Sequence, residues 1–429
     1  MRGRWDLVRD CISGQKAVKG GREKYLPKPN PADLSDENKR RYDQYIERAV
    51  FYNVTHRTHG GLVGQVFQQD PIITTPSLME MVVLDADGAG VALDQQAKKA
   101  LGMVLAFGRC GLFVDYPEVE EAATRQDLLD GKVRPTILLY EPWSVINWRT
   151  KTAGAKKLLS LVVIEESYVE EDDGFEVKTG AQWRVLRLEE ATGKYRVEIW
   201  REDNGTHKEV RHYYPRDAKG NNMVEIPFTF IGAVNNDPQI DLPPLYDLAT
   251  LNIAHYRNSA DYEEACYIVG QPTPYIAGLT KDWVQDVLKG QIYLGSRAAI
   301  PLPQGGTAGL LQASPNSMPK EAMEAKERQM VALGAKLVEQ ASVQRTATEA
   351  RQEESSEVSV LSTSAKNTSS AYQKALTWCG ELLGTEEDPE FELNTDFTIS
   401  QMTAQERAQL IAEWQAGAIA FEEMRFSLR

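Results

Sequence analysis

Few side chains of this 429-residue chain stand at spacings that could do chemistry. Asp85 and Asp87 could bind a metal through their carboxylates, but the glycines beside them favour a turn between two elements. His56 and His59 are three residues apart, and no carboxylate or thiol stands at a matching offset. Two ligands alone do not define a metal site. We therefore predict no bound metal and no cofactor.

Motifs of catalytic sites are also absent from the sequence. It has no Walker A loop, no G-x-S-x-G elbow and no H-E-x-x-H pair. The glycine-rich stretch at residues 60–67 predicts a tight turn, because no Lys-Ser or Lys-Thr pair follows it as a phosphate loop requires. The acidic run at residues 165–173 predicts a solvated loop rather than a pair of catalytic carboxylates. The chain is therefore not expected to be an enzyme.

Composition indicates a globular protein of a reducing compartment, expected to be soluble and used in a cytoplasm. Hydrophobic residues make up 42% of the chain, which is enough for substantial cores. The four cysteines lie far apart without a C-x-x-C pair. No window approaches about eighteen consecutive apolar residues, so no membrane span is expected. The net charge of -14 argues against tight wrapping of nucleic acid, because that binding neutralises phosphates with Lys and Arg.

Helices should dominate the N-terminal part of the chain. Ser35, followed by Asp36 and Glu37, is a typical N-cap and predicts a helix over residues 36–56. A further helix is expected over residues 94–107.

From residue 135 to residue 234 the apolar period changes to two, which indicates an antiparallel, β-rich unit. Hairpin turns are predicted at residues 191–194 and 204–205, which contain the glycines such turns favour. The expected strands cover residues 136–140, 158–165, 182–189, 195–200 and 224–231.

Two helices of similar length should bracket a small α/β unit. The helices are expected over residues 245–268 and 319–340. The elements expected between them are a strand near residue 275, a helix over residues 281–288, and strands near residues 291–294 and 298–302.

A long segment rich in Ser, Thr and Ala, residues 346–383, has its larger side chains at helical spacing. The hydroxylated residues have weak helix propensity, so packing against neighbours must hold the helix. The segment is too long and too weakly apolar for an ordinary core helix. We therefore predict that its face packs between subunits of an oligomer. The expected seam consists of Val358, Leu361, Ala365 and Tyr372.

An array of aromatic, arginine and glycine residues lies between positions 45 and 71. Its members are Tyr45, Arg48, Ala49, Phe51, Tyr52, Asn53, Thr55, Arg57, Thr58, Gly61, Leu62, Gly64, Val66, Phe67, Asp70 and Pro71. This array resembles the N-terminal signature of tailed-bacteriophage portal proteins, the head-to-tail connectors. More specifically, it resembles a subgroup long filed as a phage domain of unknown function.

The resemblance continues in order along the chain. Residues 245–340 are similar to the stem and clip of portals, and residues 346–351 resemble the start of the long helix after the tunnel loop. The C-terminus departs from the pattern, because some 45 residues remain after position 383, too few for the long helical barrel of some portals.

The resemblance implies a mixed α+β subunit with eight parts. These are an N-terminal helical part of the wing (1–133), a β-rich wing (134–241), a first stem helix (242–269), a clip (270–318), a second stem helix (319–340), a tunnel loop (341–348), a long helix (349–384) and short C-terminal crown helices (385–429).

As function, the resemblance implies a ring of about twelve copies at one capsid vertex of a virion, assembled in the host cytoplasm. Double-stranded DNA would pass through the ring during packaging and ejection. The implied partners are other copies of the chain, DNA in transit, the terminase large subunit, a head-tail adaptor and the major capsid protein. An acidic wall suits this role, because a basic bore would bind DNA and stall it.

Two groups of side chains would serve these contacts. The tunnel loop and its neighbours would place at the DNA channel Lys336, Gln344, Arg345, Thr346 and Arg351. The clip would present to the motor and the adaptor Thr280, Lys281, Asp282, Lys289 and Gln291.

Two other classes of function stay open. The chain could be a capsid-associated adaptor or scaffold without a pore. It could also be an enzyme, such as a metal-dependent nuclease that uses Asp85 or Asp87, or a subunit of a packaging ATPase. A ring of about twelve copies with an axial hole would favour the portal over both.

Overall fold

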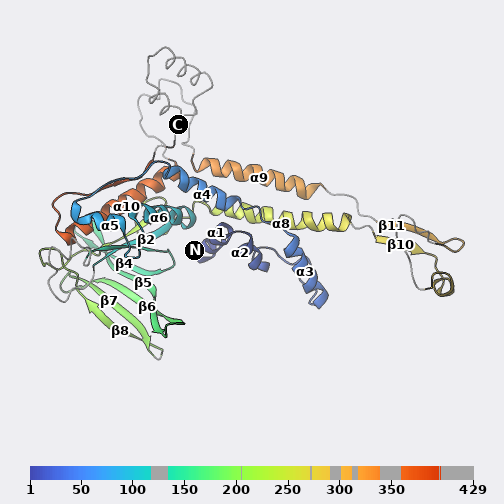
Figure 1. Cartoon of the computed structure of the whole chain (residues 1–429), viewed down its shortest axis with the longest axis horizontal. Coiled ribbons are helices and arrows are strands. Elements are labelled where there is room, and N and C mark those ends of the chain that lie inside the picture. Colours follow the sequence, from blue (N-terminus) through green and yellow to red (C-terminus); the bar gives the residue numbers. More distant parts are fainter. Residues whose placement is uncertain are drawn as a thin grey trace, which may run out of the picture.

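The computed structural model describes residues 1–116, 134–203, 205–270, 273–289, 301–311, 317–338, 359–395 and 397. These residues form a helical body around a three-stranded sheet, a five-stranded sheet below the body, and a long helical arm that ends in a two-stranded hairpin (Figure 1). The expected mixed α+β fold is confirmed.

Nine α-helices lie in the described part of the chain. They are α1 (Arg2–Ser13), α2 (Gln15–Gly20), α3 (Asp36–Arg48), α4 (Val54–Val66), α5 (Glu80–Leu84), α6 (Leu93–Phe107), α8 (Tyr246–Val269), α9 (Met318–Lys336) and α10 (Val360–Leu383). Short helical turns add η1 (Arg22–Lys24), η2 (Ser77–Met79) and the π-helix η3 (Trp283–Val287).

The N-terminal helices agree in part with the prediction. Ser35 caps α3 as expected, since its side chain accepts a hydrogen bond from the backbone N–H of Asn38. The single helix expected over residues 36–56 is wrong, because the chain breaks after α3 and starts again at α4, which Asn53 caps. The glycine-rich turn is also wrong: residues 60–66 lie inside α4, whose buried side chains include Leu62.

A three-stranded antiparallel sheet forms the centre of the body. Its order is β3–β2–β9, with β2 (Arg109–Asp115) between β3 (Thr136–Tyr140) and β9 (Phe228–Gly232). Helices α6 and α10 pack on β2 and β9. Gly108 joins α6 to β2 in the left-handed region, at φ +79°, and a Cβ there would lie 2.6 Å from the carbonyl oxygen of Asp241. Only glycine fits this close turn.

The five-stranded sheet is an antiparallel meander in the order β4–β5–β6–β7–β8. Its strands are β4 (Val145–Ala153), β5 (Lys156–Asp172), β6 (Val177–Leu188), β7 (Tyr195–Asp203) and β8 (Thr206–Tyr213). Three of these, β5, β6 and β7, were expected, as was the turn at residues 191–194, whereas β4 and β8 were not. The solvated loop expected at residues 165–173 is wrong, since β5 extends through Asp172.

A half-buried polar network joins the two sheets. Arg184 of β6 forms ion pairs with Asp115 at the end of β2 and with Glu166 of β5. The Tyr213 hydroxyl donates to Asp115 at 3.0 Å, and the Tyr140 hydroxyl donates to Glu166. Each carboxylate therefore has a cationic or hydroxyl partner, which offsets the cost of its burial.

Two small sheets complete the described structure. Strand β1 (Ile72–Thr74) pairs with β12 (Glu390–Glu392) and ties the residues after α10 to the body. Strand β10 (Thr273–Ala277) pairs with β11 (Thr307–Leu311) at the far end of the arm (Figure 1). Among the described helices, none is long and apolar enough to cross a membrane.

Candidate assembly surfaces and channel segment

The arm consists of α8 and α9, which lie side by side and antiparallel. They correspond to the two expected helices of similar length. Lys326 of α9 donates to the side-chain oxygen of Asn258 of α8 at 2.6 Å. Nearby, the ring Nε2 of His255 lies 3.1 Å from a carboxylate oxygen of Glu327. These polar contacts fix the register of the two helices.

Residues of α3, α4 and the segment between them hold α8 in place. The Tyr45 hydroxyl donates to Asp261 at 2.5 Å, and Arg48 forms an ion pair with Glu264. Asn252, which is fully buried, accepts from the Thr55 hydroxyl at 2.9 Å. Asn252 also donates to the carbonyl of Tyr52 at 2.8 Å. Tyr45, Arg48, Tyr52 and Thr55 all belong to the array that resembles the portal signature. The array therefore acts as a clamp on the first arm helix.

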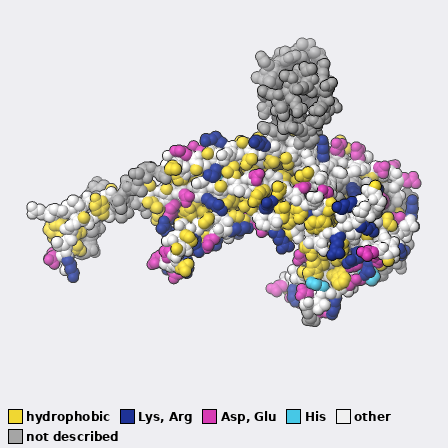
Figure 2. Space-filling model, turned by 180° about the vertical axis from the view of Figure 1, so that it is seen from behind, with side chains coloured by type: hydrophobic (Ala, Val, Ile, Leu, Met, Phe, Trp, Pro, Cys, Tyr) yellow, Lys and Arg dark blue, Asp and Glu magenta, His cyan; other side chains and the backbone are white. Residues whose placement is uncertain are grey.

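Helix α9 is poorly covered by its own chain. Of its 19 residues only Met330 is buried, while Val331 is 71% exposed and Met318 is 72% exposed. Figure 2 shows apolar side chains running along the helical arm and body, interleaved with charges of both signs. A face of this kind is typical of a helix that other subunits cover.

The described residues on either side of the segment expected to form the tunnel loop lie close together. The backbone N–H of Leu361, in the first turn of α10, donates to the carbonyl of Leu337, just after α9, at 3.1 Å. Lys336 is exposed beside this point. The other four tunnel residues, Gln344, Arg345, Thr346 and Arg351, lie outside the described residues.

The long helix begins later than expected. Ser359 has extended backbone angles, and its side chain caps α10 by accepting from the N–H of Ser362. A helix cannot continue through a residue in this conformation, so the expected helix over residues 349–384 is wrong at its start.

The seam expected on α10 is wrong as well. Leu361, Ala365 and Tyr372 are fully buried inside their own chain, and Val358 lies outside the described residues. Tyr372 stacks on Phe391 with ring centroids 5.1 Å apart. Its hydroxyl donates to Gln96 of α6 at 3.1 Å. These side chains are therefore core residues rather than contacts between subunits.

The hydroxylated residues of α10 explain how this helix is buried. Thr368 donates to the carbonyl of Ser364 at 2.8 Å, and Ser369 donates to that of Ala365 at 2.9 Å. The hydroxyls of Thr368 and Ser369 therefore have hydrogen-bond partners within the helix. The small side chains also let β9 approach closely, where Asn367 donates to the carbonyl of Gly232 at 2.9 Å.

The predicted clip residues gather around η3 near the end of the arm. Thr280 accepts from the backbone N–H of Trp283, and Lys281 and Asp282 are exposed beside it. Lys289 follows η3 with a positive φ of 49°. Gln291 lies outside the described residues. The four described residues are therefore exposed, three of them just before η3 and Lys289 just after it.

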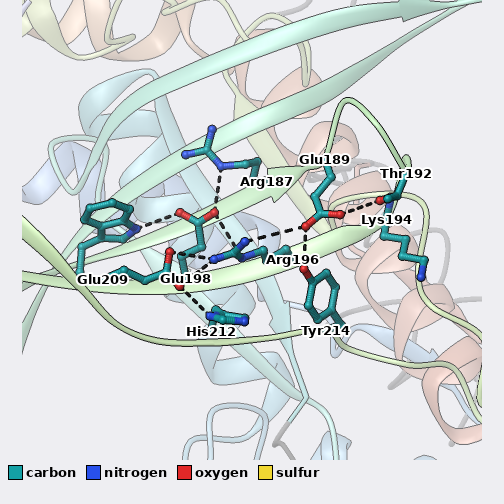
Figure 3. Close-up of polar contacts among 10 residues, drawn as sticks. Arg187, Glu189, Thr192, Lys194, Arg196, Glu198, Glu209, His212 and Tyr214 are labelled. Atoms are coloured by element: carbon teal, nitrogen blue, oxygen red, sulfur yellow. Dashed lines mark hydrogen bonds and ion pairs between the residues drawn. The ribbon is translucent and has the colours of Figure 1, made fainter.

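The face of the five-stranded sheet shown in Figure 3 carries a charge network that sequence reasoning missed. Arg196 pairs with Glu209 at 2.7 Å, and Arg187 pairs with Glu198 at 3.0 Å. The indole N–H of Trp200 also donates to Glu198, at 2.9 Å. The two arginines are thus already neutralised, so this face offers little free charge to phosphates.

The residues considered for metal binding are engaged elsewhere. Asp85 accepts from the backbone N–H groups of Gly88 and Gly90, which makes it a turn residue, and it pairs with Arg134. The ring nitrogens of His56 and His59 contact backbone carbonyls at 3.0 and 2.9 Å. Among the residues that the structure describes, no group of His, Cys, Asp and Glu is arranged to hold a metal ion.

The buried cysteines are poor nucleophiles. Burial raises the pKa of the Cys11 thiol to about 12, and it raises the pKa of Cys110 and of Cys379 further. Since the thiolate is the reactive form, these three side chains behave as small apolar groups.

One family model matches about a third of the chain. Residues 244–382, which are 139 of the 429 residues, match the family model described as a domain of unknown function (DUF4055). The expected resemblance to a subgroup filed as a domain of unknown function is confirmed for this part, which spans the arm and α10. No curated protein matches the chain.

The chain is also similar to solved structures of gene transfer agent particles. One is the virion of a native particle, with 16% identity and a TM-score of 0.42, covering 87% of this chain and 89% of that chain. Another is the neck of a native particle computed with C12 symmetry, with 16% identity and a TM-score of 0.43, covering 88% and 90%. The neck of an empty particle computed with C6 symmetry gives 16% identity and a TM-score of 0.42, covering 90% and 92%.

Proposed function

We propose that this chain is the subunit of a phage portal, a ring at one vertex of a virion through which double-stranded DNA is packaged and ejected. The observation that carries the proposal is the clamp on α8. Residues quoted for the portal resemblance, Tyr45, Arg48 and Thr55, bind the first arm helix directly. The residues that carry the sequence resemblance therefore help to hold the arm in place.

The path of the chain supports the same role. The arm leaves the body along α8, turns at the β10–β11 hairpin and returns along α9 to the point where α10 begins. The described residues that flank residues 339–358 therefore lie together at the base of the arm. In a ring of arms this base faces the axis, and we assign to it the constriction formed by Lys336, Gln344, Arg345, Thr346 and Arg351.

The charge of the chain fits a conduit. Its net charge is -14, and two of the arginines on the face of the five-stranded sheet in Figure 3 are paired with carboxylates. DNA carries one negative charge per about 1.7 Å of its axis, so an acidic wall lets it slide without being held. A few cations at the narrowest ring would be enough to guide it.

The parts of the subunit follow from this arrangement. The wing (1–133 and 134–241) would face the major capsid protein, the stem (242–269 and 319–340) would line neighbouring stems, and the clip (270–318) would dock the terminase large subunit and then the head-tail adaptor. Assembly would occur in the host cytoplasm, with about twelve copies in the ring. The segment 349–384 would support the tunnel loop, and the last residues, 385–429, would form a short crown.

Imaging of the purified chain tests the proposal. We expect particles with rotational symmetry and an axial hole in negative stain, with about twelve copies by sedimentation. A solid or monomeric particle under all conditions that favour assembly would support the adaptor or scaffold instead. A divalent-dependent nuclease activity that is lost in both Asp85→Asn and Asp87→Asn would support the enzyme.

Function in the virion tests the constriction separately. The variant Arg345→Ala should assemble normally but alter DNA packaging or retention, because the side chain contributes charge at the bore. Loss of ring formation in this variant would show that Arg345 lies between subunits instead.

A further inference from the structure

The β4–β5 turn, at one end of the five-stranded sheet, is basic. Residues 149–157, which form the β4–β5 turn and the strand ends beside it, contain four cations and no acidic residue. The cations are Arg149, Lys151, Lys156 and Lys157. Three of them are exposed and Lys151 is half-buried. In the part of the chain that the structure describes, no carboxylate forms an ion pair with any of the four.

The opposite end of the same sheet is acidic and carries an exposed aromatic ring. Residues 170–176, at the β5–β6 turn, contain five acidic residues and no cation. Phe175 at the tip is 97% exposed, and Val169 and Val177 beside it are 59% and 56% exposed. Lys178 is the nearest cation and contacts Glu170 at 3.4 Å.

The acidic tip is a defined structure rather than a loose loop. The Asp173 side chain accepts from the backbone N–H groups of Phe175 and Glu176 at 2.8 and 2.7 Å. These bonds also lower the pKa of Asp173, so the carboxylate stays charged. The turn therefore holds the backbone of Phe175 in place, so binding would cost little backbone freedom.

The two ends cannot meet within one chain. Both lie on β5, which runs without interruption from Lys156 to Asp172 and spans roughly 50 Å at about 3.3 Å per residue. Each end concentrates charges of one sign, whose repulsion an oppositely charged surface would relieve.

We propose that the acidic tip of one copy docks on the basic β4–β5 turn of the next copy, as a head-to-tail contact around the ring. The proposal rests on the portal function proposed above, and it names one of the contacts that would close the ring. A contact between two different patches of the same chain generates rings when the rotation closes. The half-buried Leu158, which is paired with Lys151 in the β4–β5 ladder, offers apolar surface beside the basic turn for the Phe175 ring.

A second copy is the occupant that the charges favour. The whole chain is acidic, with a net charge of -14, so much of its surface would repel the tip. The basic turn is a surface of opposite sign that every copy already carries. Charge complementarity of this kind sets the register and direction of a contact.

Paired charge reversals test the contact. The acid-reversed variant carries Glu170→Lys, Glu171→Lys and Glu176→Lys, which changes the charge of residues 170–176 from -5 to +1. The base-reversed variant carries Arg149→Glu, Lys156→Glu and Lys157→Glu, which changes the charge of residues 149–157 from +4 to -2. We expect each variant alone to form rings about tenfold less than wild type at low salt, because like charges then face each other. An equimolar mixture should recover ring formation, since each tip again meets a turn of opposite sign, and the rings should alternate the two variants.

Controls separate the contact from general effects of charge. The variant Glu386→Lys with Glu387→Lys and Asp388→Lys makes the same change of net charge as the acid-reversed variant, at exposed residues beyond α10, and should assemble like wild type. Circular dichroism should show that all variants are folded. Carbodiimide cross-linking of wild type should join residues 170–176 of one copy to Lys156 or Lys157 of another, which mass spectrometry of mixed heavy and light chains detects.

The outcomes distinguish this contact from the portal function. Rings that form equally well in both reversed variants, or a mixture that fails to recover, would overturn the contact and leave the portal proposal standing. A wild-type chain that stays monomeric at every concentration and salt would overturn both.

Discussion

Helices α10 and α9 differ strongly in how much of each helix is buried within its own chain. Helix α10 buries 14 of its 24 side chains, whereas α9 buries only Met330 among 19. The sequence suggests the reverse, because α10 is hydroxylated and α9 carries large apolar residues on one face. The comparison teaches that the partner of a helix is set by where the helix lies: α10 lies on a sheet, and α9 lies on a single helix.

The difference in burial between the two helices indicates which surfaces other copies must cover. The body, with α10 at its centre, is a finished core that should fold alone. The arm has one buried side chain on α9 and a two-stranded hairpin at its end, and such a hairpin is marginally stable by itself. Assembly should therefore depend on the arm and folding on the body.

The substitution Leu361→Asp should have the largest effect, because it tests the finished side of this comparison. Leu361 is fully buried, and an unpaired charge there costs several kcal/mol. We expect the monomer to be unfolded or insoluble, while Leu361→Met should cost less than about 1.5 kcal/mol. Urea unfolding and soluble yield measure this. A folded Leu361→Asp monomer that merely fails to assemble would return this residue to a seam between subunits.

The substitution Val331→Glu tests the unfinished side. Val331 is 71% exposed on α9, so the change should leave the free energy of unfolding within about 0.5 kcal/mol of wild type. Ring formation should fall about tenfold, since a charge would enter a packed contact between stems. The contrasting variant Met330→Glu, one residue away but buried, should destabilise the monomer itself. Normal rings from Val331→Glu would mean that this face stays open.

The elements of the fold that could be predicted are those with strong local signals. The cap at Ser35, helix α6 and the arm helices followed from caps and apolar spacing. The break between α3 and α4 was missed because the apolar side chains of residues 49–53 keep a helical spacing. The backbone nevertheless leaves the helix there, and the carbonyl of Tyr52 accepts a hydrogen bond from Asn252 of α8.

The candidate site was predicted less well, for a physical reason. Which residues of α10 are buried within the chain depends on contacts with α6 and β9, which lie far away in sequence. Spacing reveals a face but not its partner. The β4–β5 turn and the acidic tip were visible as charge runs, yet only the register of β5 shows that they occupy opposite ends of one strand.

Helix α4 lies between the two regions, and its glycines can sharpen the comparison. A Cβ at Gly60 or Gly64 would meet nothing within 4 Å, and neither glycine has a positive φ. Each change to alanine should therefore stabilise the monomer by about 0.5–1 kcal/mol through helix propensity. Thermal unfolding measures this gain.

A matched control for these glycines lies in α6. A Cβ at Gly102 would lie 3.2 Å from the ring of His59, so Gly102→Ala should give no such gain. If Gly60→Ala and Gly64→Ala stabilise the monomer but weaken the ring, a neighbouring copy approaches this face of α4 closely. If assembly is unchanged, the surfaces that other copies cover are restricted to the arm and the five-stranded sheet.

The smallest expected effect concerns the inner side of α4, where His59 contacts the Gly102 carbonyl. Burial lowers the pKa of His59 below its usual value near 6.5, and the bond to Gly102 opposes this only in part. The folded state thus binds a proton more weakly than the unfolded state, so stability should be lost as the pH falls through about 6.5. Urea unfolding at pH 7.5, 6.5 and 5.5 should show a steeper loss for wild type than for His59→Gln. Equal losses of stability in wild type and His59→Gln would mean that the contact between α4 and α6 opens readily. The buried core would then end at α6.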